Sequence, residues 1–293
     1  MNYYEKIKNE LINNEVYKKV KDYSKNRSDL NTYYKVGKLL KDAGKSYGEG
    51  IIKKYSDMLT KELGKGYGLS NLKNMRRFYN IAKSQTVSDL LSWSHYVELL
   101  KIDDINKINY YIRISEEQNL SYRKLRERIK SREYERLDDN TKEKLINKEK
   151  VNAGDLIKNP ILIKNKFDTN KISEKMLMSF ILEDIPSFLK QLGEGFTFIE
   201  NEYPIKIGDR YNYIDILLYN IYDNCYVVIE LKINEIKKEH IGQVEMYMNF
   251  IDKNLRTINQ SPTIGIIVCK KKNGYLFKYV TNKKIYEREY ELV

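Results

Sequence analysis

Two apolar runs that carry acidic residues constrain this chain more than any other feature. They are YIDILLY at 213–219 and CYVVIELK at 225–232, and they contain Asp215, Glu230 and Lys232. Burying an unpaired carboxylate is costly, so acidic residues among Ile, Leu, Val and Tyr need a partner. The β-branched and aromatic residues predict strands, and the turn-forming residues between the runs predict an antiparallel hairpin.

Alternation along the second strand puts Glu230 and Lys232 on one face and Leu231 on the other. If Asp215 shares the face of Glu230, the oxygens of the two carboxylates suit a hard divalent cation such as Mg²⁺. Such a cation polarises a phosphate and activates water, and a neighbouring ammonium stabilises developing negative charge. The pattern predicts a phosphodiesterase site, although a strand-end cap and an exposed edge pair would also fit so short a motif.

The next segment, HIGQVEMYM at 240–248, is predicted to be helical, with Gln243 and Tyr247 four residues apart on one face. A D…ExK pattern followed by Q-x3-Y resembles the PD-(D/E)xK nuclease superfamily. The runs IDILLY, VVIELK, GQVEMY and PTIGIIVCKKK are similar to its YhcG-type branch. The N-terminal half resembles the helical domain of the same family at YG (47–48), GKGYGLSNL (64–72), MRRFY (75–79), LSWSHY (91–96), SYRKL (121–125) and YERL (134–137).

This resemblance implies a restriction-endonuclease-like α/β core and a nuclease that hydrolyses DNA with Mg²⁺ or Mn²⁺. The catalytic residues that it implies are Asp215, Glu230, Lys232, Gln243 and Tyr247. Asp215, Glu230 and the Leu231 carbonyl would hold the cation, and Lys232 would assist the attacking water. Gln243 would hydrogen-bond a phosphate oxygen or the lysine, and Tyr247 would orient it. Packing of the helix is the alternative role for that pair.

One position departs from the family pattern. Members of this branch carry a glutamate in the first helix of the nuclease core, but the aligned position here falls at Leu177-Met178. Glu174, one helical turn earlier, is our predicted replacement as a metal ligand, with Glu183 and Glu200 as the other candidates. Loss of the family glutamate also fits a different function, a catalytically weak or inactive DNA- or protein-binding scaffold of the same fold.

Residues 1–137 are predicted to be mainly helical. The segments 51–63, 64–68 and 69–83 have the proportions of a helix–turn–helix, whose second helix could enter a major groove. A bundle helix with a solvated basic face fits the same pattern equally well. The candidate DNA-binding residues are Lys73, Asn74, Arg76 and Arg77 on this helix, and Arg123 and Arg126 in a later basic stretch.

Charge is unevenly distributed along the chain. Residues 1–150 hold 33 Lys/Arg against 22 Asp/Glu, whereas residues 151–293 hold 20 against 19. A near-neutral domain with a carboxylate site beside a basic domain suits an enzyme whose polyanionic substrate is captured mainly by the other domain. The predicted domains are therefore a basic helical DNA-binding domain at 1–137, a linker at 138–170 and a nuclease domain at 171–293.

The chain shows no signal-peptide pattern and no run of about 20 apolar residues, so we expect a cytoplasmic protein without membrane contact. Cys225 and Cys269 lack metal-site spacing and are expected to be buried thiols. The expected partner is DNA, with foreign DNA, branched DNA and RNA all open as substrates. A homodimer would follow if each chain contributed one active site to a double-strand break.

Overall fold

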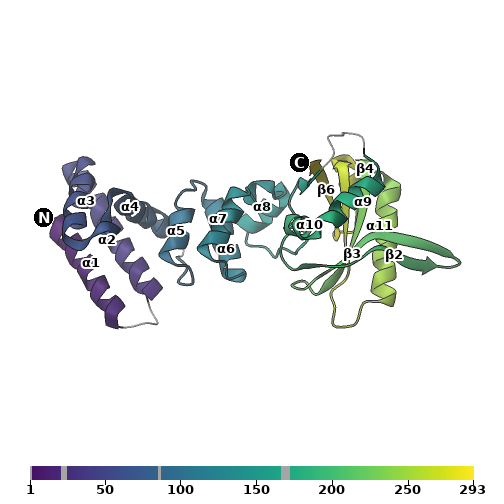
Figure 1. Ribbon diagram of the computed structural model, residues 1–293, viewed down its shortest axis with the longest axis horizontal. Helices are drawn as coiled ribbons and strands as arrows, with labels where there is room; N and C mark the ends of the chain where they lie inside the picture. The colour runs from purple at the N-terminus through teal and green to yellow at the C-terminus, as the bar shows by residue number, and fades with distance from the viewer. Residues whose placement is uncertain (1, 21–24, 85–86, 166–171) are drawn as a thin grey trace. The chain divides into compact units, whose positions relative to one another are not determined.

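The computed structural model describes residues 2–20, 25–84, 87–165 and 172–293. The chain divides into two compact units, Met1–Tyr134 and Glu135–Val293, drawn from purple to yellow in Figure 1. Within the described residues, no helix is both long and apolar enough to cross a bilayer.

The first unit is helical, as predicted. Its helices are α1 (Tyr3–Val20), α2 (Lys25–Tyr47), α3 (Gly50–Leu63), α4 (Leu69–Ser84), α5 (Trp93–Leu99), α6 (Ile105–Glu117) and α7 (Tyr122–Lys130), with a 3-10 turn η1 (Lys65–Tyr67) and another, η2 (Tyr134–Arg136), at the unit boundary. Leu72, Met75 and Phe78 on α4 are buried at three-residue spacing, which explains why this segment forms a core helix. Gly37 lets α2 approach α4 closely, because a Cβ there would lie 2.2 Å from the Met75 carbonyl oxygen.

The second unit is built on one mixed sheet. Its strands are β1 (Ile161–Ile163), β2 (Phe196–Ile207), β3 (Arg210–Asn220), β4 (Cys225–Glu235), β5 (Ile264–Lys271) and β6 (Ile285–Leu292), in the order β1-β6-β5-β4-β3-β2. The β2, β3 and β4 strands pair antiparallel, and β4, β5, β6 and β1 pair parallel. The predicted hairpin at 213–232 is confirmed as β3 and β4.

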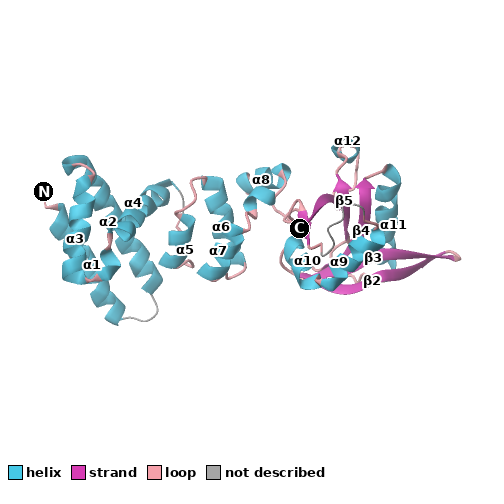
Figure 2. Cartoon of the chain, turned by 45° about the horizontal axis from the view of Figure 1, so that its top comes forward, coloured by secondary structure: helices cyan, strands magenta, loops and turns pink. Residues whose placement is uncertain are grey.

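Helices cover both faces of this sheet, as Figure 2 shows. The helices α9 (Glu174–Glu183) and α10 (Ile185–Leu192) pack on one core, and α11 (Lys238–Asn254) packs on the other. Each core takes alternate residues of β4: Val227, Ile229 and Leu231 on the first, Val228 on the second. The domain is thus the mixed α/β fold that the sequence predicted.

The apolar run at 276–280 does not form the last strand of the sheet. Residues Gly274–Phe277 form the short helix α12, and the last strand is β6. Leu276, Phe277 and Val280 pack on the α11 core at helical spacing, so the apolar residues of this run follow the period of a helix.

The described part of 138–170 differs from the linker that we predicted. It contains α8 (Asp139–Ile146) and β1, which extends the sheet beside β6, and it belongs to the second unit. Ile157, Ile161 and Ile163 are buried in the α9–α10 core. These buried residues are few in an otherwise polar segment, and a strand of three residues is too short to show a clear period.

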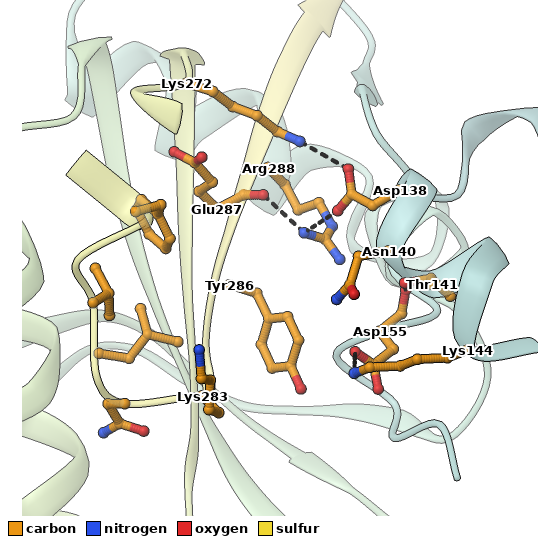
Figure 3. A pocket seen from close by; sticks show the side chains of 14 residues that line it. Asp138, Asn140, Thr141, Lys144, Asp155, Lys272, Lys283, Tyr286, Glu287 and Arg288 are labelled. Carbon is orange, nitrogen blue, oxygen red and sulfur yellow. Dashed lines mark hydrogen bonds and ion pairs between the residues drawn. The ribbon is translucent and has the colours of Figure 1, made fainter. Parts of the chain in front are cut away.

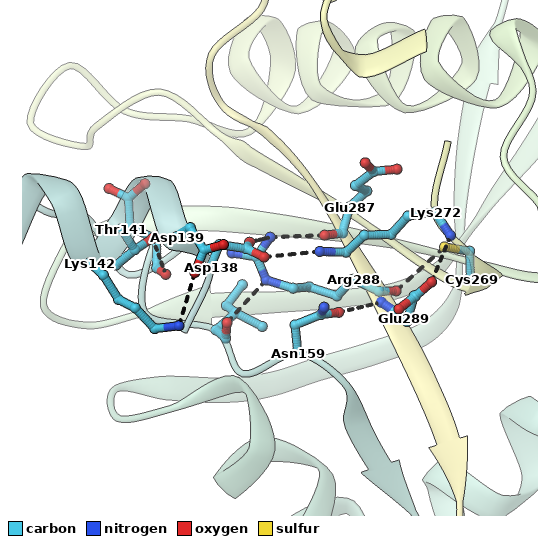
Figure 4. Close-up of polar contacts among 12 residues, drawn as sticks. Asp138, Asp139, Thr141, Lys142, Asn159, Cys269, Lys272, Glu287, Arg288 and Glu289 are labelled. Atoms are coloured by element: carbon cyan, nitrogen blue, oxygen red, sulfur yellow. Dashed lines mark hydrogen bonds and ion pairs between the residues drawn. The ribbon is translucent and has the colours of Figure 1, made fainter. Parts of the chain in front are cut away.

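A buried ion pair joins this segment to the sheet (Figure 4). Arg288 on β6 pairs with Asp138 at 2.7 Å and donates to the carbonyl oxygens of Gly154 and Ile157. Lys272 reaches the other Asp138 oxygen at 3.0 Å. A cavity of about 620 Å³ lies beside these residues, and Lys144 and Asp155 pair at 2.9 Å on the same side of it as Asp138 (Figure 3).

Asp138→Ala is expected to destabilise the protein by roughly 2–4 kcal/mol, because Arg288 keeps a buried charge after losing its carboxylate partner. Urea unfolding should show a lower midpoint with an unchanged slope. Asp139→Ala is the matched control, since that neighbouring side chain is 99% exposed. Equal midpoints for the two variants would contradict a structural role for the ion pair.

Candidate active site

The hairpin places the two predicted carboxylates at the end of its ladder. The last β3–β4 pair is Ile216 with Ile229, and Asp215 and Glu230 follow one residue beyond it on each strand. The Leu231 N–H donates to an Asp215 carboxylate oxygen at 2.7 Å. Because the N–H and C=O of a strand residue point to the same side, the Leu231 carbonyl also faces β3 beyond the ladder.

Lys232 lies among carboxylates. Its ammonium is 2.8 Å from one Glu230 oxygen and 3.4 Å from a Glu174 oxygen. Glu174 is the first residue of α9, which Ser173 caps by accepting a hydrogen bond from the Met176 N–H. The structure therefore brings together Asp215, Glu230, Lys232 and Glu174, with three carboxyl groups around one ammonium.

Burial dominates the electrostatics of this cluster. Glu230 is 2% exposed, and burial together with the charge of Asp215 raises its pKa to about 7. Burial also raises the pKa of Asp215. Burial alone would lower the pKa of Lys232, but the hydrogen bond and charge of Glu230 outweigh it and raise that pKa. The lysine stays charged while the carboxylates are costly to ionise.

These residues fit a divalent cation. The second carboxylate oxygen of Glu230 is buried without a hydrogen-bond partner among the described residues, and Asp215 lies beside it. Hard cations take such oxygens, and their charge would offset the excess of carboxylates. In the part of the chain that the structure describes, no three His, Cys, Asp or Glu side chains are arranged around one metal position. Glu174 instead faces Lys232, so the candidate ligands that remain are two carboxylates and a backbone carbonyl.

Gln243 and Tyr247 lie one helical turn apart on α11. The Gln243 amide donates to the Tyr247 hydroxyl at 2.8 Å. Burial raises the pKa of Tyr247, and the charges of Glu230 and Asp215 add to the rise. His240, at the start of α11, accepts a hydrogen bond from the Lys237 N–H and so acts in the helix start.

Sequence reasoning missed Glu202. Its negative charge contributes to the raised pKa of Asp215, so the two carboxyl groups are neighbours. The β2–β3 register shifts between Phe198 and Glu200, and Glu202 has a positive φ of 49°. Such irregularities re-aim side chains, and this one is invisible in a simple alternation pattern.

Three of the predicted DNA-binding residues have carboxylate partners. Arg76 pairs with Glu49, Arg77 with Asp103, and Arg126 with Glu98. The other three are Lys73 and Arg123, which are exposed, and Asn74, which is half-buried. Arg123 lies over the Tyr122 ring at 5.8 Å from the centroid. Free cationic groups are therefore fewer on this unit than its composition suggests.

Two family models match this chain, and the boundary between them lies close to the boundary between the two compact units. Residues 155–293 match the family model of the YhcG PDDEXK nuclease domain, and residues 9–136 match that of the DUF1016 N-terminal domain. The chain thus combines a DUF1016 N-terminal domain with a PDDEXK nuclease domain of the YhcG family. The Escherichia coli (strain K12) protein named "Putative nuclease YhcG" is 22% identical over 288 residues, which cover 83% of this chain and 77% of that protein.

Two solved structures also resemble part of the chain. One is a repair endonuclease from Pyrococcus abyssi, with a TM-score of 0.32 and 21% identity over 42% of this chain and 49% of that chain. The other is an EndoMS–dsDNA2 complex, with a TM-score of 0.32 and 17% identity over 43% of this chain and 48% of that chain. This chain therefore spans about half the length of each, and the family assignment depends on the two family models.

Proposed function

We propose that this protein is a divalent-metal-dependent nuclease that hydrolyses phosphodiester bonds in DNA. The observation that carries the proposal is the buried, unpartnered Glu230 oxygen beside Asp215 and the Lys232 ammonium. An unsatisfied buried acceptor costs about 1–3 kcal/mol, and a cation bound to that oxygen would remove the cost.

Asp215, Glu230 and the Leu231 carbonyl would hold Mg²⁺ or Mn²⁺. When bound, the cation would polarise the scissile phosphate and lower the pKa of a water molecule. Lys232, held by Glu230 and Glu174, would place a fixed positive charge where negative charge develops on the phosphate. Gln243, oriented by Tyr247, would hydrogen-bond a phosphate oxygen or the lysine.

Incubating the purified chain with linear, circular, single-stranded and branched DNA tests this proposal. Each substrate is combined with Mg²⁺, Mn²⁺ or EDTA, and single-stranded RNA is added as a further arm. We expect DNA cleavage with either cation and none with EDTA. Cleavage in EDTA, or of RNA alone, would overturn the proposal. DNA that is retarded in a gel but never cut would favour the inactive scaffold of the same fold.

Among the candidate DNA-binding residues, the exposed ones for which the described structure shows no carboxylate partner should matter most. Lys73→Ala and Arg123→Ala are each expected to weaken DNA binding and to lower the salt-dependence slope of affinity by roughly 0.9 per lost phosphate contact. Arg126→Ala should instead lower the melting temperature, because Arg126 donates to the buried Glu98 carboxylate at 2.6 and 2.9 Å. Titrations at several salt concentrations, with thermal melts, measure both effects. A larger loss of binding in the Arg126 variant would contradict this assignment.

A further inference from the structure

One segment of the nuclease domain concentrates its positive charge. Residues 270–284, KKKNGYLFKYVTNKK, contain six lysines and no acidic residue. The rest of 151–293 holds 14 Lys/Arg against 19 Asp/Glu. A polyanion that approaches this domain would therefore be attracted mainly to this segment. We call residues 270–284 the basic–aromatic segment.

Its lysines differ in their partners. Lys271 pairs with Glu235 at 4.0 Å, and Lys272 pairs with Asp138. Lys278 lies 5.5 Å from the centroid of the Tyr275 ring. Lys278 and Lys283 are exposed, so their ammonium groups can donate to phosphate oxygens without first breaking a buried contact.

Two tyrosines of the segment are directed to solvent. Tyr275 is 83% exposed and Tyr279 is 85% exposed, far more than a tyrosine that serves packing. The intervening Leu276 and Phe277 pack on the α11 core, and Asn273 caps α12 by accepting from the Leu276 N–H. Packing on the α11 core thus holds the backbone of the segment in place, while the two tyrosine rings remain exposed to solvent.

The segment begins next to the active site. Cys269, its immediate predecessor on β5, is the register partner of Lys232 on β4. Neighbouring strands lie about 4.8 Å apart, so the chain leaves the sheet at the level of the catalytic lysine. The Asn273 amide also reaches the Ile236 carbonyl oxygen at the end of β4. The carboxyl ends of β4 and β5 therefore lie at the same edge of the sheet, and open α/β sheets bind ligands at this edge.

We propose that the basic–aromatic segment binds the substrate as an unpaired strand, with Lys278 and Lys283 on its phosphates and Tyr275 and Tyr279 stacked on its bases. The inference rests on the proposed nuclease function and adds a substrate class to it: DNA with single-stranded character near the scissile bond. Exposed rings between cations are the combination that binds single strands, whereas bases inside a duplex are already stacked on one another. Lysines alone would not discriminate between the two forms.

The test uses the full chain and a fluorescein-labelled single-stranded DNA 20-mer or its blunt duplex, in EDTA so that cleavage does not interfere. Tyr275→Ala and Tyr279→Ala are each expected to weaken single-strand binding about 5- to 150-fold, with little effect on the duplex. Lys278→Gln combined with Lys283→Gln should lower the single-strand salt slope by roughly 1.4. Irradiating 5-iodouracil-substituted single strand should cross-link peptides that contain Tyr275 or Tyr279.

Matched controls lie elsewhere on the same domain. Tyr222→Ala removes a 66% exposed ring beyond the opposite end of β4, and Lys190→Gln with Lys253→Gln removes two exposed charges from α10 and α11. These variants should bind like the parent. Equal losses for single strand and duplex in the tyrosine variants would overturn base stacking. Unchanged affinity, or cross-links confined to other peptides, would overturn the whole inference. Cleavage with Mg²⁺ is assayed separately on each preparation, so an inactive protein that still binds would refute the nuclease function alone.

Discussion

Lys232→Ala is expected to lower the rate of metal-dependent DNA cleavage by about 100- to 1000-fold, the usual cost of removing one group that stabilises transition-state charge. The ammonium lies within 3.4 Å of two carboxylates and is the charged donor closest to Glu230. Its removal also leaves three carboxyl groups facing one another, which opposes their ionisation. Single-turnover rates at saturating Mg²⁺ measure the chemical step separately from binding.

The matched control is Lys175→Ala. Lys175 follows Glu174 on α9 and is exposed, so the variant loses the same charge near the site without touching the cluster. Its cleavage rate should stay close to that of the parent chain. If both variants cleaved at the parental rate, Lys232 would have no catalytic role and the assignment of the active site would be wrong.

Glu230→Gln is expected to stabilise the metal-free protein at pH 8 by up to about 3 kcal/mol, the free energy that corresponds to a pKa raised from 4.5 to about 7. Between these two pH values the folded state binds the proton more tightly than the unfolded state, so stability falls as pH rises. The glutamine variant is neutral at this position over the whole pH range, so its stability should not fall for this reason. Asp215, whose pKa is also raised, should leave a smaller slope of the same sign.

Denaturant unfolding from pH 4.5 to pH 8 measures this difference in stability. Adding Mg²⁺ at pH 8 should reverse which of the two proteins is the more stable. The cation should raise the stability of the parent at pH 8, because it binds only the folded site, and should leave the glutamine variant unchanged. Glu235→Gln, at the half-exposed end of β4, controls for charge and should follow the parent in both arms. A glutamine variant that is less stable than the parent at pH 8 without metal would contradict the buried-charge interpretation.

Local patterns predicted the elements that carry the chemistry. Alternation in β4 was enough to place Glu230 and Lys232 on one face, and four-residue spacing was enough to place Gln243 beside Tyr247. Both relations follow from backbone geometry within one element. The position of Glu174 beside Lys232 is different, because it depends on how α9 packs on the sheet 58 residues away in sequence.

The features that the sequence did not predict also depend on contacts between residues that are distant in the chain. β1 is a strand because it pairs with the edge of β6, more than 120 residues later in the chain. No local sequence period indicates that pairing. Glu202 depends on a bulge, and the partners of Arg76 and Arg126 lie 27 and 28 residues away in sequence. Composition identifies charges, whereas only the fold shows which of them are already neutralised.

The pairing of β1 with β6 also decides where the nuclease domain can be cut. A fragment that starts at residue 171 would lack β1 and would expose the backbone edge of β6 along Tyr290–Leu292. Unprotected edges recruit strands from other molecules, so such a fragment should aggregate. The Asp138–Arg288 pair would be lost as well. A fragment of the nuclease domain that keeps both contacts therefore has to begin at or before Asp138, and so has to include the whole predicted linker.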